Sequence, residues 1–334
     1  MGVKKTILPV DVSVIIPCFN EENTIQILLE AIRDQDYPRT KIEVVIADAF
    51  SEDNTREKIR EFSELHQDLK VCVVDNPKRT IPAAVNIAVE NAMGEFIVRM
   101  DAHSAPNREY IRHSVELLKS GKAQNVGGTW EIKPGSTTCM AKAIARAASH
   151  PLGAGDASYR TKGDSGYVDT VPFGAFRRDF FISIGKFNEE MLSNEDYEFN
   201  TRVRKSGGKI WMDTRIQSQY YARKTLKELS WQYWRYGFWK FKMLKKFPDS
   251  IRWRQAIPPL FVLFLVLFGI LSFVSSFALI IFSAVAGVYL SALVAAGVFE
   301  SVKKKDACYL LMTFALITMH FSWGGGFLFS IFRN

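Results

Sequence analysis

The sequence predicts an α/β protein, in which a doubly wound sheet is followed by an amphipathic helix and C-terminal transmembrane helices. Three observations support this fold class. Apolar runs of strand length alternate with helical patterns over residues 12–100. A helical segment within 226–254 is dense in aromatic and basic side chains. Residues 257–299 contain no Asp, Glu, Lys, Arg or His, and this stretch is long enough for two membrane spans of about 20 residues each.

The first half of the chain predicts a parallel sheet with a ligand site at the strand ends. The expected strands are 12–17, 42–47, 71–74 and 95–100. The helices between them are 25–32, a helix that starts within 51–55 and runs to about 65, and 81–93. Ligands of such sheets bind beyond the carboxyl ends of the strands. No glycine-rich phosphate loop follows the first strand, which argues against a dinucleotide or Walker motif. Instead Glu21, Asp48 and Asp101 follow three strands, where they can bind a base, a ribose or a metal.

Asp101 and His103 form the most informative local pattern. The two residues alternate just after an apolar strand, so their side chains point to the same side. A carboxylate beside an imidazole can hold a divalent cation, which can in turn hold a diphosphate. The alternative is structural: Asp101 caps the helix that follows Pro106, and His103 is simply exposed.

Further elements are expected along the second half of the soluble region. They are a helix at 107–119, a strand at 126–132, a helix at 138–149, a mobile Gly-, Ser- and Asp-rich loop at 153–166, and a strand-like segment at 170–178 with a glycine break. The sequence Asn194-Glu195-Asp196 then opens a helix. In a structural interpretation, Asn194 is the N-cap, and Glu195 and Asp196 suit the first helical turn.

The C-terminal third predicts membrane association. Thr225 and Glu228 form a capping box, and the helix behind it fits a membrane interface, with an ordinary core helix as the alternative. Two spans joined near 275–276 and a third apolar stretch at 307–332 follow. His320 within the third stretch is a functional candidate or reaches the interface. The glycines at 324–326 allow close helix packing or a re-entrant turn.

Charge and cysteine content bound the partners and the compartment. The formal net charge is +8, and basic residues cluster just before the apolar tail, which suits an anionic membrane better than nucleic acid. The basic flanks at 252–254 and 303–305 fall on one side of the predicted spans, which is the cytosolic side by the positive-inside rule. The four cysteines lack paired spacing and are expected to be buried thiols of a reducing compartment. Residues 1–11 lack the apolar core of a signal peptide.

These motifs together resemble family 2 glycosyltransferases with the GT-A fold, a Rossmann-like, doubly wound mixed sheet. The resemblance covers about residues 10–240 and is close at 12–22, 48–55 and 194–198. Together with the C-terminal membrane segments, Asp101-Ala102-His103 is most similar to membrane-anchored, succinoglycan-type exopolysaccharide glucosyltransferases.

The resemblance implies roles for individual residues. Pro17, Glu21 and Asp48 would line the nucleoside pocket, with Asp48 facing the base. Asp101 would lie near the ribose and diphosphate, and His103 stands where the family usually has the second metal-binding aspartate. Imidazole suits Mn²⁺ better than Mg²⁺.

The same resemblance assigns the remaining catalytic groups. Asp196 would be the general base, with Glu195 as its neighbour. The segment 232–236 is similar to the family's QxxRW motif with Tyr236 in place of Trp, and Gln232 and Arg235 would contact the donor.

The predicted function follows from these assignments. Residues 1–225 would form a cytosolic GT-A domain, 226–254 an interface helix region, and 255–334 a membrane domain with about three transmembrane helices. The chain would be a multi-pass protein of the cell (inner) membrane. It would be an inverting hexosyltransferase using UDP-glucose, a divalent cation (Mn²⁺ or Mg²⁺) and a lipid-linked sugar or polysaccharide acceptor. Two alternatives are a polyprenyl-phosphate hexose synthase and a catalytically degenerate nucleotide-sugar-binding subunit.

Overall fold

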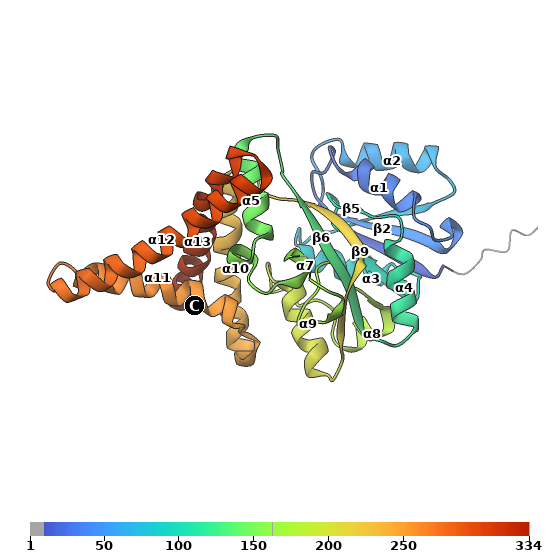
Figure 1. The fold of residues 1–334 in the computed structure, drawn as a ribbon. Helices are drawn as coiled ribbons and strands as arrows, with labels where there is room; N and C mark the ends of the chain where they lie inside the picture. Colours follow the sequence, from blue (N-terminus) through green and yellow to red (C-terminus); the bar gives the residue numbers. More distant parts are fainter. Residues whose placement is uncertain (1–9, 162, 334) are drawn as a thin grey trace, which may run out of the picture. The chain divides into compact units, whose positions relative to one another are not determined.

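The computed structural model describes residues 10–161 and 163–333, so most of the segment 1–11 and part of the predicted loop 153–166 lie outside it. The chain forms two compact units (Figure 1). The first comprises Met1–Glu131 and Lys162–Tyr220, and the second comprises Ile132–Thr161 and Tyr221–Asn334. The predicted boundaries at 225 and 254 remain predictions. The compact units group the chain differently, because 132–161 joins the C-terminal helices.

The parallel half of the first unit's sheet follows the sequence pattern. Its strands are β1 (Val12–Cys18), β2 (Ile42–Asp48), β3 (Lys70–Asp75) and β4 (Phe96–Arg99). They lie in the order β3-β2-β1-β4 and are mutually parallel, with Cys18 opposite Asp48 and Ile15 opposite Arg99. Almost every residue of β1, β2 and β4 is buried, as expected for a parallel sheet covered on both faces. The carboxyl ends of the four strands therefore meet at one edge.

Amphipathic helices connect these strands, and the predicted helices are present. Helices α1 (Ile25–Arg33), α2 (Thr55–Leu65) and α3 (Ile81–Glu90) connect β1, β2, β3 and β4 in turn, and α4 (Tyr110–Lys119) follows later in the chain. Helix α1 buries Ile25, Leu28, Leu29 and Ile32, which is the i, i+3, i+4, i+7 spacing of one helical face. The short 3₁₀ helix η1 (Arg39–Lys41) leads from α1 into β2.

Antiparallel strands extend the sheet beyond β4 and make it mixed, which confirms the predicted fold class. They are β8 (Ala175–Arg177), β6 (Asn125–Lys133), β9 (Ile210–Tyr221), β5 (Ala105–Pro106) and β7 (Gly166–Tyr167). Strand β8 pairs antiparallel with β4 and with β6. Helix α8 (Arg178–Ser183) and helix α9 (Glu195–Lys205) complete this part of the unit.

The structure differs from the sequence prediction at 170–178. Only Ala175–Arg177 is strand, because Phe173 and Gly174 both adopt positive φ angles and turn the backbone before β8. A Cβ atom on Gly174 would lie 2.6 Å from Asn125 Oδ1, so the glycine also permits a close approach. The predicted loop at 153–166 likewise contains two short helices, α6 (Pro151–Ala154) and α7 (Ser158–Thr161).

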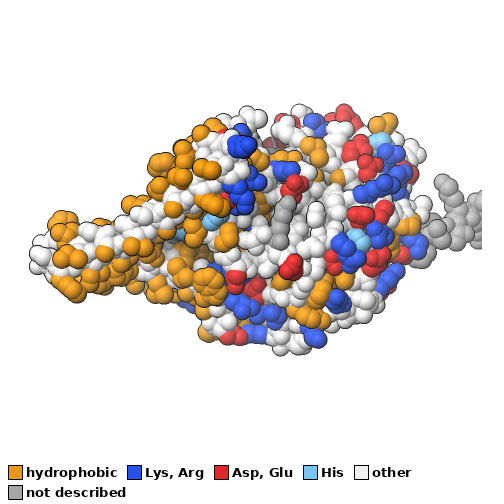
Figure 2. All heavy atoms as spheres, viewed as in Figure 1, with side chains coloured by type: hydrophobic (Ala, Val, Ile, Leu, Met, Phe, Trp, Pro, Cys, Tyr) orange, Lys and Arg blue, Asp and Glu red, His pale blue; other side chains and the backbone are white. Residues whose placement is uncertain are grey.

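The second unit is helical and carries the apolar C-terminal segments. Besides α6 and α7, it contains α5 (Cys139–Ser149), α10 (Leu226–Lys246), η2 (Pro248–Ser250), α11 (Trp253–Leu271), α12 (Ser276–Lys304), η3 (Ala307–Leu311) and α13 (Met312–Phe332). Among the described residues, three helical segments are long and apolar enough to cross a membrane: Trp253–Leu271, Ser276–Lys304 and Ala307–Phe332. Hydrophobic side chains cover the hairpin of α11 and α12 (Figure 2). Phe273 at its tip is 89% exposed, which in water would be unfavourable and in lipid is not.

The glycine triplet in α13 serves close helix packing. Helix α13 is continuous from Met312 to Phe332, so no re-entrant turn occurs there. A Cβ atom on Gly326 would lie 2.2 Å from the Trp234 carbonyl oxygen of α10, and one on Gly324 would lie 2.6 Å from the Pro258 carbonyl oxygen of α11. Small residues thus let α13 pack directly on the backbones of two neighbours.

His320 has a structural explanation. Its Nδ1 lies 3.0 Å from Tyr289 Oη on α12, and its Nε2 lies 2.8 Å from the carbonyl oxygen of Leu152. A neutral imidazole satisfies both contacts, with one nitrogen donating and the other accepting. His320 therefore joins α13 to α12 and α6.

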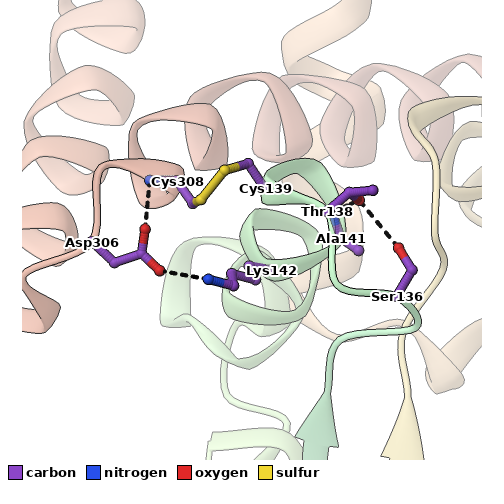
Figure 3. The surroundings of a disulfide bond; sticks show 7 residues. All are labelled: Ser136, Thr138, Cys139, Ala141, Lys142, Asp306 and Cys308. Carbon is purple, nitrogen blue, oxygen red and sulfur yellow. Dashed lines mark hydrogen bonds and ion pairs between the residues drawn. A yellow bond between two sulfur atoms is a disulfide. The ribbon is translucent and has the colours of Figure 1, made fainter.

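The prediction that all four cysteines are free thiols is wrong. Cys139 and Cys308 form a disulfide across 169 residues, while Cys18 and Cys72 are free (Figure 3). The bond joins the first turn of α5 to η3, and Lys142 Nζ pairs with Asp306 at 2.9 Å on the same face of α5. Sequence spacing identifies only local cysteine pairs, so a partner from a distant helix escapes it. The cysteine content consequently no longer argues for a reducing compartment.

Replacing Cys139 and Cys308 together by serine tests this bond. Because the disulfide closes a long loop, its loss should destabilise the second unit by about 2–4 kcal/mol and lower its melting temperature in detergent. Cys72→Ser is the control and should melt like the unchanged protein. A wild-type chain that carries four alkylatable thiols without reductant would contradict the assignment.

Candidate active site

A cleft opens at the carboxyl ends of the parallel strands in the first unit. Its volume is about 170 Å³. Four of the predicted site residues line it: Pro17, Glu21, Asp101 and His103. Pro17 lies in β1, Glu21 follows β1, and Asp101 and His103 follow β4, which is the neighbour of β1 in the sheet. The topology therefore assembles this part of the site as the strand pattern predicts.

Glu21 and His103 contact each other in this cleft. His103 Nδ1 lies 3.0 Å from Glu21 Oε1, and the Glu21 carboxylate also accepts a hydrogen bond from Thr24 Oγ1. The Glu21 backbone N–H donates to Thr55 Oγ1 at 2.7 Å, which ties the loop after β1 to the start of α2. His103 therefore lies beside the carboxylate of Glu21, which follows a different strand. In the sequence it is two residues after Asp101.

Asp48 is more enclosed than predicted. Its side chain is fully buried, and it accepts hydrogen bonds from Ser51 Oγ at 2.5 Å, Ser51 N at 3.1 Å and Arg56 Nε at 2.5 Å. Its neighbour Ala49 lines the cleft. The predicted contact of Asp48 with a nucleobase stays a prediction.

Arg99 lies at the centre of the acidic residues and was given no role by the sequence analysis. It is 2% exposed at the end of β4. Its Nη1 donates to Asp196 Oδ1, and its Nη2 donates to Asp101 Oδ1 at 3.2 Å and to Glu195 Oε1 at 3.3 Å. A signal was available in the sequence, because an arginine in a buried strand needs acidic partners.

Aromatic residues enclose the Arg99 guanidinium. The Phe173 and Phe187 rings lie 5.9 and 5.6 Å from it, within the range of cation–π contact. Phe173 has a φ of 60°, which is unusual for a bulky residue and is held here by the surrounding packing. The Arg99 backbone N–H also donates to the carbonyl oxygen of Gly174 at 3.1 Å.

Helix α9 is positioned so that its first turn reaches Arg99. Asn194 adopts a left-handed conformation and makes no side-chain capping hydrogen bond, so the N-cap interpretation fails for its side chain. Phe199 packs among Phe176, Phe181 and Phe187 with ring centroids 5.1–5.5 Å apart. This aromatic cluster anchors α9, so that the acidic N-terminus of the helix contacts the Arg99 guanidinium.

The surroundings of this cluster shift the pKa of the Asp196 carboxyl. Removal from bulk water raises its pKa, the positive charge of Arg99 lowers it, and the negative charges of Glu195 and Asp101 raise it again. The net effect places the pKa of Asp196 above the ordinary value of about 4 for aspartate. The side chain is 29% exposed, so it can meet a substrate.

The cleft residues suit a cation that is held jointly by protein side chains and by a diphosphate. In residues 10–161 and 163–333, no three His, Cys, Asp or Glu side chains form a ready metal cage. Magnesium-like ions at nucleotide sites are typically held by one or two protein ligands plus phosphate oxygens, so a complete cage is not required. Asp101 Oδ1 accepts a hydrogen bond from Arg99, and Asp101 and His103 line the same cleft, so a carboxylate and an imidazole could serve as cation ligands there.

Three further residues that the sequence analysis missed line the cleft after β3: Asn76, Arg79 and Thr80. Asn76 is 1% exposed, and its Oδ1 and Thr80 Oγ1 bond to none of the described residues. Two more residues are predicted to contact the donor. Gln232 and Arg235 are on α10 of the second unit, where Gln232 Nε2 donates to Tyr236 Oη at 3.0 Å. Their role toward a donor stays a prediction.

Comparisons with known proteins agree with this architecture. The model of the family described as "Glycosyl transferase family 2" matches residues 13–185. The succinoglycan biosynthesis protein ExoA of Rhizobium meliloti is 32% identical over 94% of this chain and 93% of its own length. A glucuronosyltransferase of Methanococcus voltae, named for a dolichyl N-acetyl-glucosaminyl phosphate acceptor, is 30% identical over 81% of this chain and 85% of its own.

A solved structure shares the fold. The mannosyltransferase PcManGT of Pyrobaculum calidifontis, described in complex with GDP-Man and Mn²⁺, superimposes with a TM-score of 0.62 at 20% identity. The match covers 95% of this chain and 89% of the other. Together with the family model and the two relatives, it confirms the resemblance stated from the motifs. The chain therefore belongs to glycosyl transferase family 2 and is a nucleotide-sugar-dependent glycosyltransferase.

Proposed function

We propose that this glycosyltransferase moves glucose from UDP-glucose to a lipid-linked or polysaccharide acceptor, with inversion at the anomeric carbon. One observation carries the mechanism. Asp196 has one oxygen bound to Arg99, and its other oxygen bonds to none of the described residues. Through Arg99 it is joined to Asp101, which lines the donor cleft. A single partly exposed base beside a donor site is the arrangement that an inverting transfer requires.

The reaction then proceeds by direct displacement. The acceptor hydroxyl gives its proton to Asp196 Oδ2 while its oxygen forms a bond to the anomeric carbon. The bond from that carbon to the diphosphate breaks, and its electron pair leaves on UDP. Glu195 stays paired with Arg99 and keeps the first turn of α9 in place. Glycosidases differ because they use two carboxylates that flank the bond.

We propose that Asp101 and His103 hold a divalent cation together with the donor diphosphate. The bound cation would neutralise charge on the leaving diphosphate. The mixed oxygen and nitrogen ligands favour Mn²⁺ over Mg²⁺. The fold relative from Pyrobaculum calidifontis is described with GDP-Man and Mn²⁺, which supports a divalent cation in the family.

The acceptor is proposed from the relatives and the helices. Two relatives are named for succinoglycan biosynthesis and for a dolichyl-linked sugar phosphate. Three helical segments of the described chain are long and apolar enough to cross a membrane, which would bring a lipid-linked sugar within reach. The basic residues 303–305 at the end of α12, with Arg252 and Arg254, support a multi-pass inner-membrane protein with a cytosolic catalytic domain.

Asp196→Asn tests the base assignment. The variant should lower the rate of glucose transfer from UDP-glucose to a membrane lipid extract by about 10²–10⁴-fold, because the acceptor proton has no recipient. UDP affinity should be unchanged. The assay measures labelled lipid and released UDP from detergent-purified protein with Mn²⁺, with Mg²⁺ and with a chelator. GDP-mannose serves as the competing donor.

Asp179→Asn is the matched control, since Asp179 also lies in the first turn of a helix but its side chain is 94% exposed. It should keep full activity. Full transfer by Asp196→Asn would overturn the base assignment. Transfer to bare polyprenyl phosphate would instead indicate a polyprenyl-phosphate hexose synthase. UDP binding without turnover under any metal or donor would indicate a binding subunit.

The raised pKa of Asp196 predicts the pH dependence. The base must be ionised to accept a proton. We therefore expect kcat/KM to be low at acid pH and to rise through a pKa above the ordinary aspartate value of about 4. The fall in kcat/KM at acid pH should persist in His103→Gln, which removes the nearby imidazole. A profile of kcat/KM that stays flat down to pH 5 would contradict the environment described for Asp196.

A further inference from the structure

We propose that Arg99 is a positioning residue that fixes the base Asp196 relative to the donor-site residue Asp101. This inference rests on the proposed function and adds a residue to it. Arg99 is the one described side chain that bonds both carboxylates. Asp101 follows β4, whereas Asp196 is 95 residues further along on α9. Without Arg99, neither β4 nor α9 would by itself fix the distance between the Asp101 and Asp196 carboxylates.

Arg99 acts through these carboxylates and not on the substrate. It is 2% exposed, and both of its terminal nitrogens are engaged by acidic side chains. Its Nε bonds to none of the described residues and is enclosed. A donor in the cleft would meet Asp101, which lines it, and Asp196 is 29% exposed, whereas the guanidinium is buried behind these carboxylates.

The guanidinium is suited to this task because it is a rigid, planar fork. Nη1 holds Asp196, and Nη2 is shared by Asp101 and Glu195, so one group sets three positions. The rings of Phe173 and Phe187 restrict movement of the fork. Without Arg99 the carboxylates would repel one another.

Arg99→Lys is the direct test, because it keeps the charge and loses the fork. An ammonium is a point charge that cannot hold Asp196 and Asp101 in one fixed geometry. We expect kcat for glucose transfer to fall about 10²-fold, as for a small misplacement of a catalytic group, with donor KM and UDP affinity nearly unchanged. Arg202→Lys is the matched control. Arg202 is a partly buried arginine of α9 that binds Glu198 and the carbonyl oxygens of Ile184 and Lys186, away from Arg99. Arg202→Lys should lower the stability of the protein and leave kcat unchanged.

Two further measurements keep the test decisive if Arg99→Lys folds poorly. In Arg99→Ala, millimolar guanidinium chloride should restore part of kcat, whereas it should not act on Arg202→Ala. Phe187→Leu retains Arg99 but removes one enclosing ring, and it should lower kcat more than Phe181→Leu from the same aromatic cluster.

The outcomes separate this proposal from the proposed function. A wild-type protein without transfer activity would refute the function itself. With an active wild type, a wild-type kcat in Arg99→Lys, or a raised donor KM with unchanged kcat, would overturn the positioning role. Equal effects of Phe187→Leu and Phe181→Leu, or no guanidinium rescue, would also count against it.

Discussion

The structure depends on one buried positive charge. Arg99 ends a strand whose other residues are apolar, and removing a guanidinium from water is costly unless acids surround it. Asp101, Glu195 and Asp196 provide those acids from two distant segments. The ion pairs that make the buried charge tolerable also bring together the groups of the active site. Folding stability and active-site geometry therefore share the same interaction.

The rest of the first unit supports this cluster. Parallel pairing brings the ends of β1 and β4 together, so Glu21 and His103 meet in the cleft. The aromatic cluster around Phe199 holds α9, and the turn at Phe173 and Gly174 encloses the guanidinium. In the second unit, small residues on α13 let apolar helices pack closely, and the Cys139–Cys308 bond joins α5 to η3.

The sequence predicted the parallel strands and the acidic residues that follow them because these depend on local patterns. Buried strands are continuous apolar runs, and acids after them face a ligand site by topology. It could not predict contacts set by tertiary structure. Nothing local to Cys139 indicates Cys308, and nothing local to Asp196 indicates Arg99. The enclosure of the Asp48 carboxylate was missed for the same reason, because it depends partly on Arg56 of α2.

The most direct test of the account is a structure of the protein with UDP and Mn²⁺ bound. The account predicts the ion on Asp101 and the diphosphate, with Arg99 still bridging Asp101 and Asp196, and Asp196 facing the open side of the donor site. An ion coordinated by Asp196, or an Arg99 side chain bound to the diphosphate and separated from Asp196, would contradict both the base assignment and the positioning role.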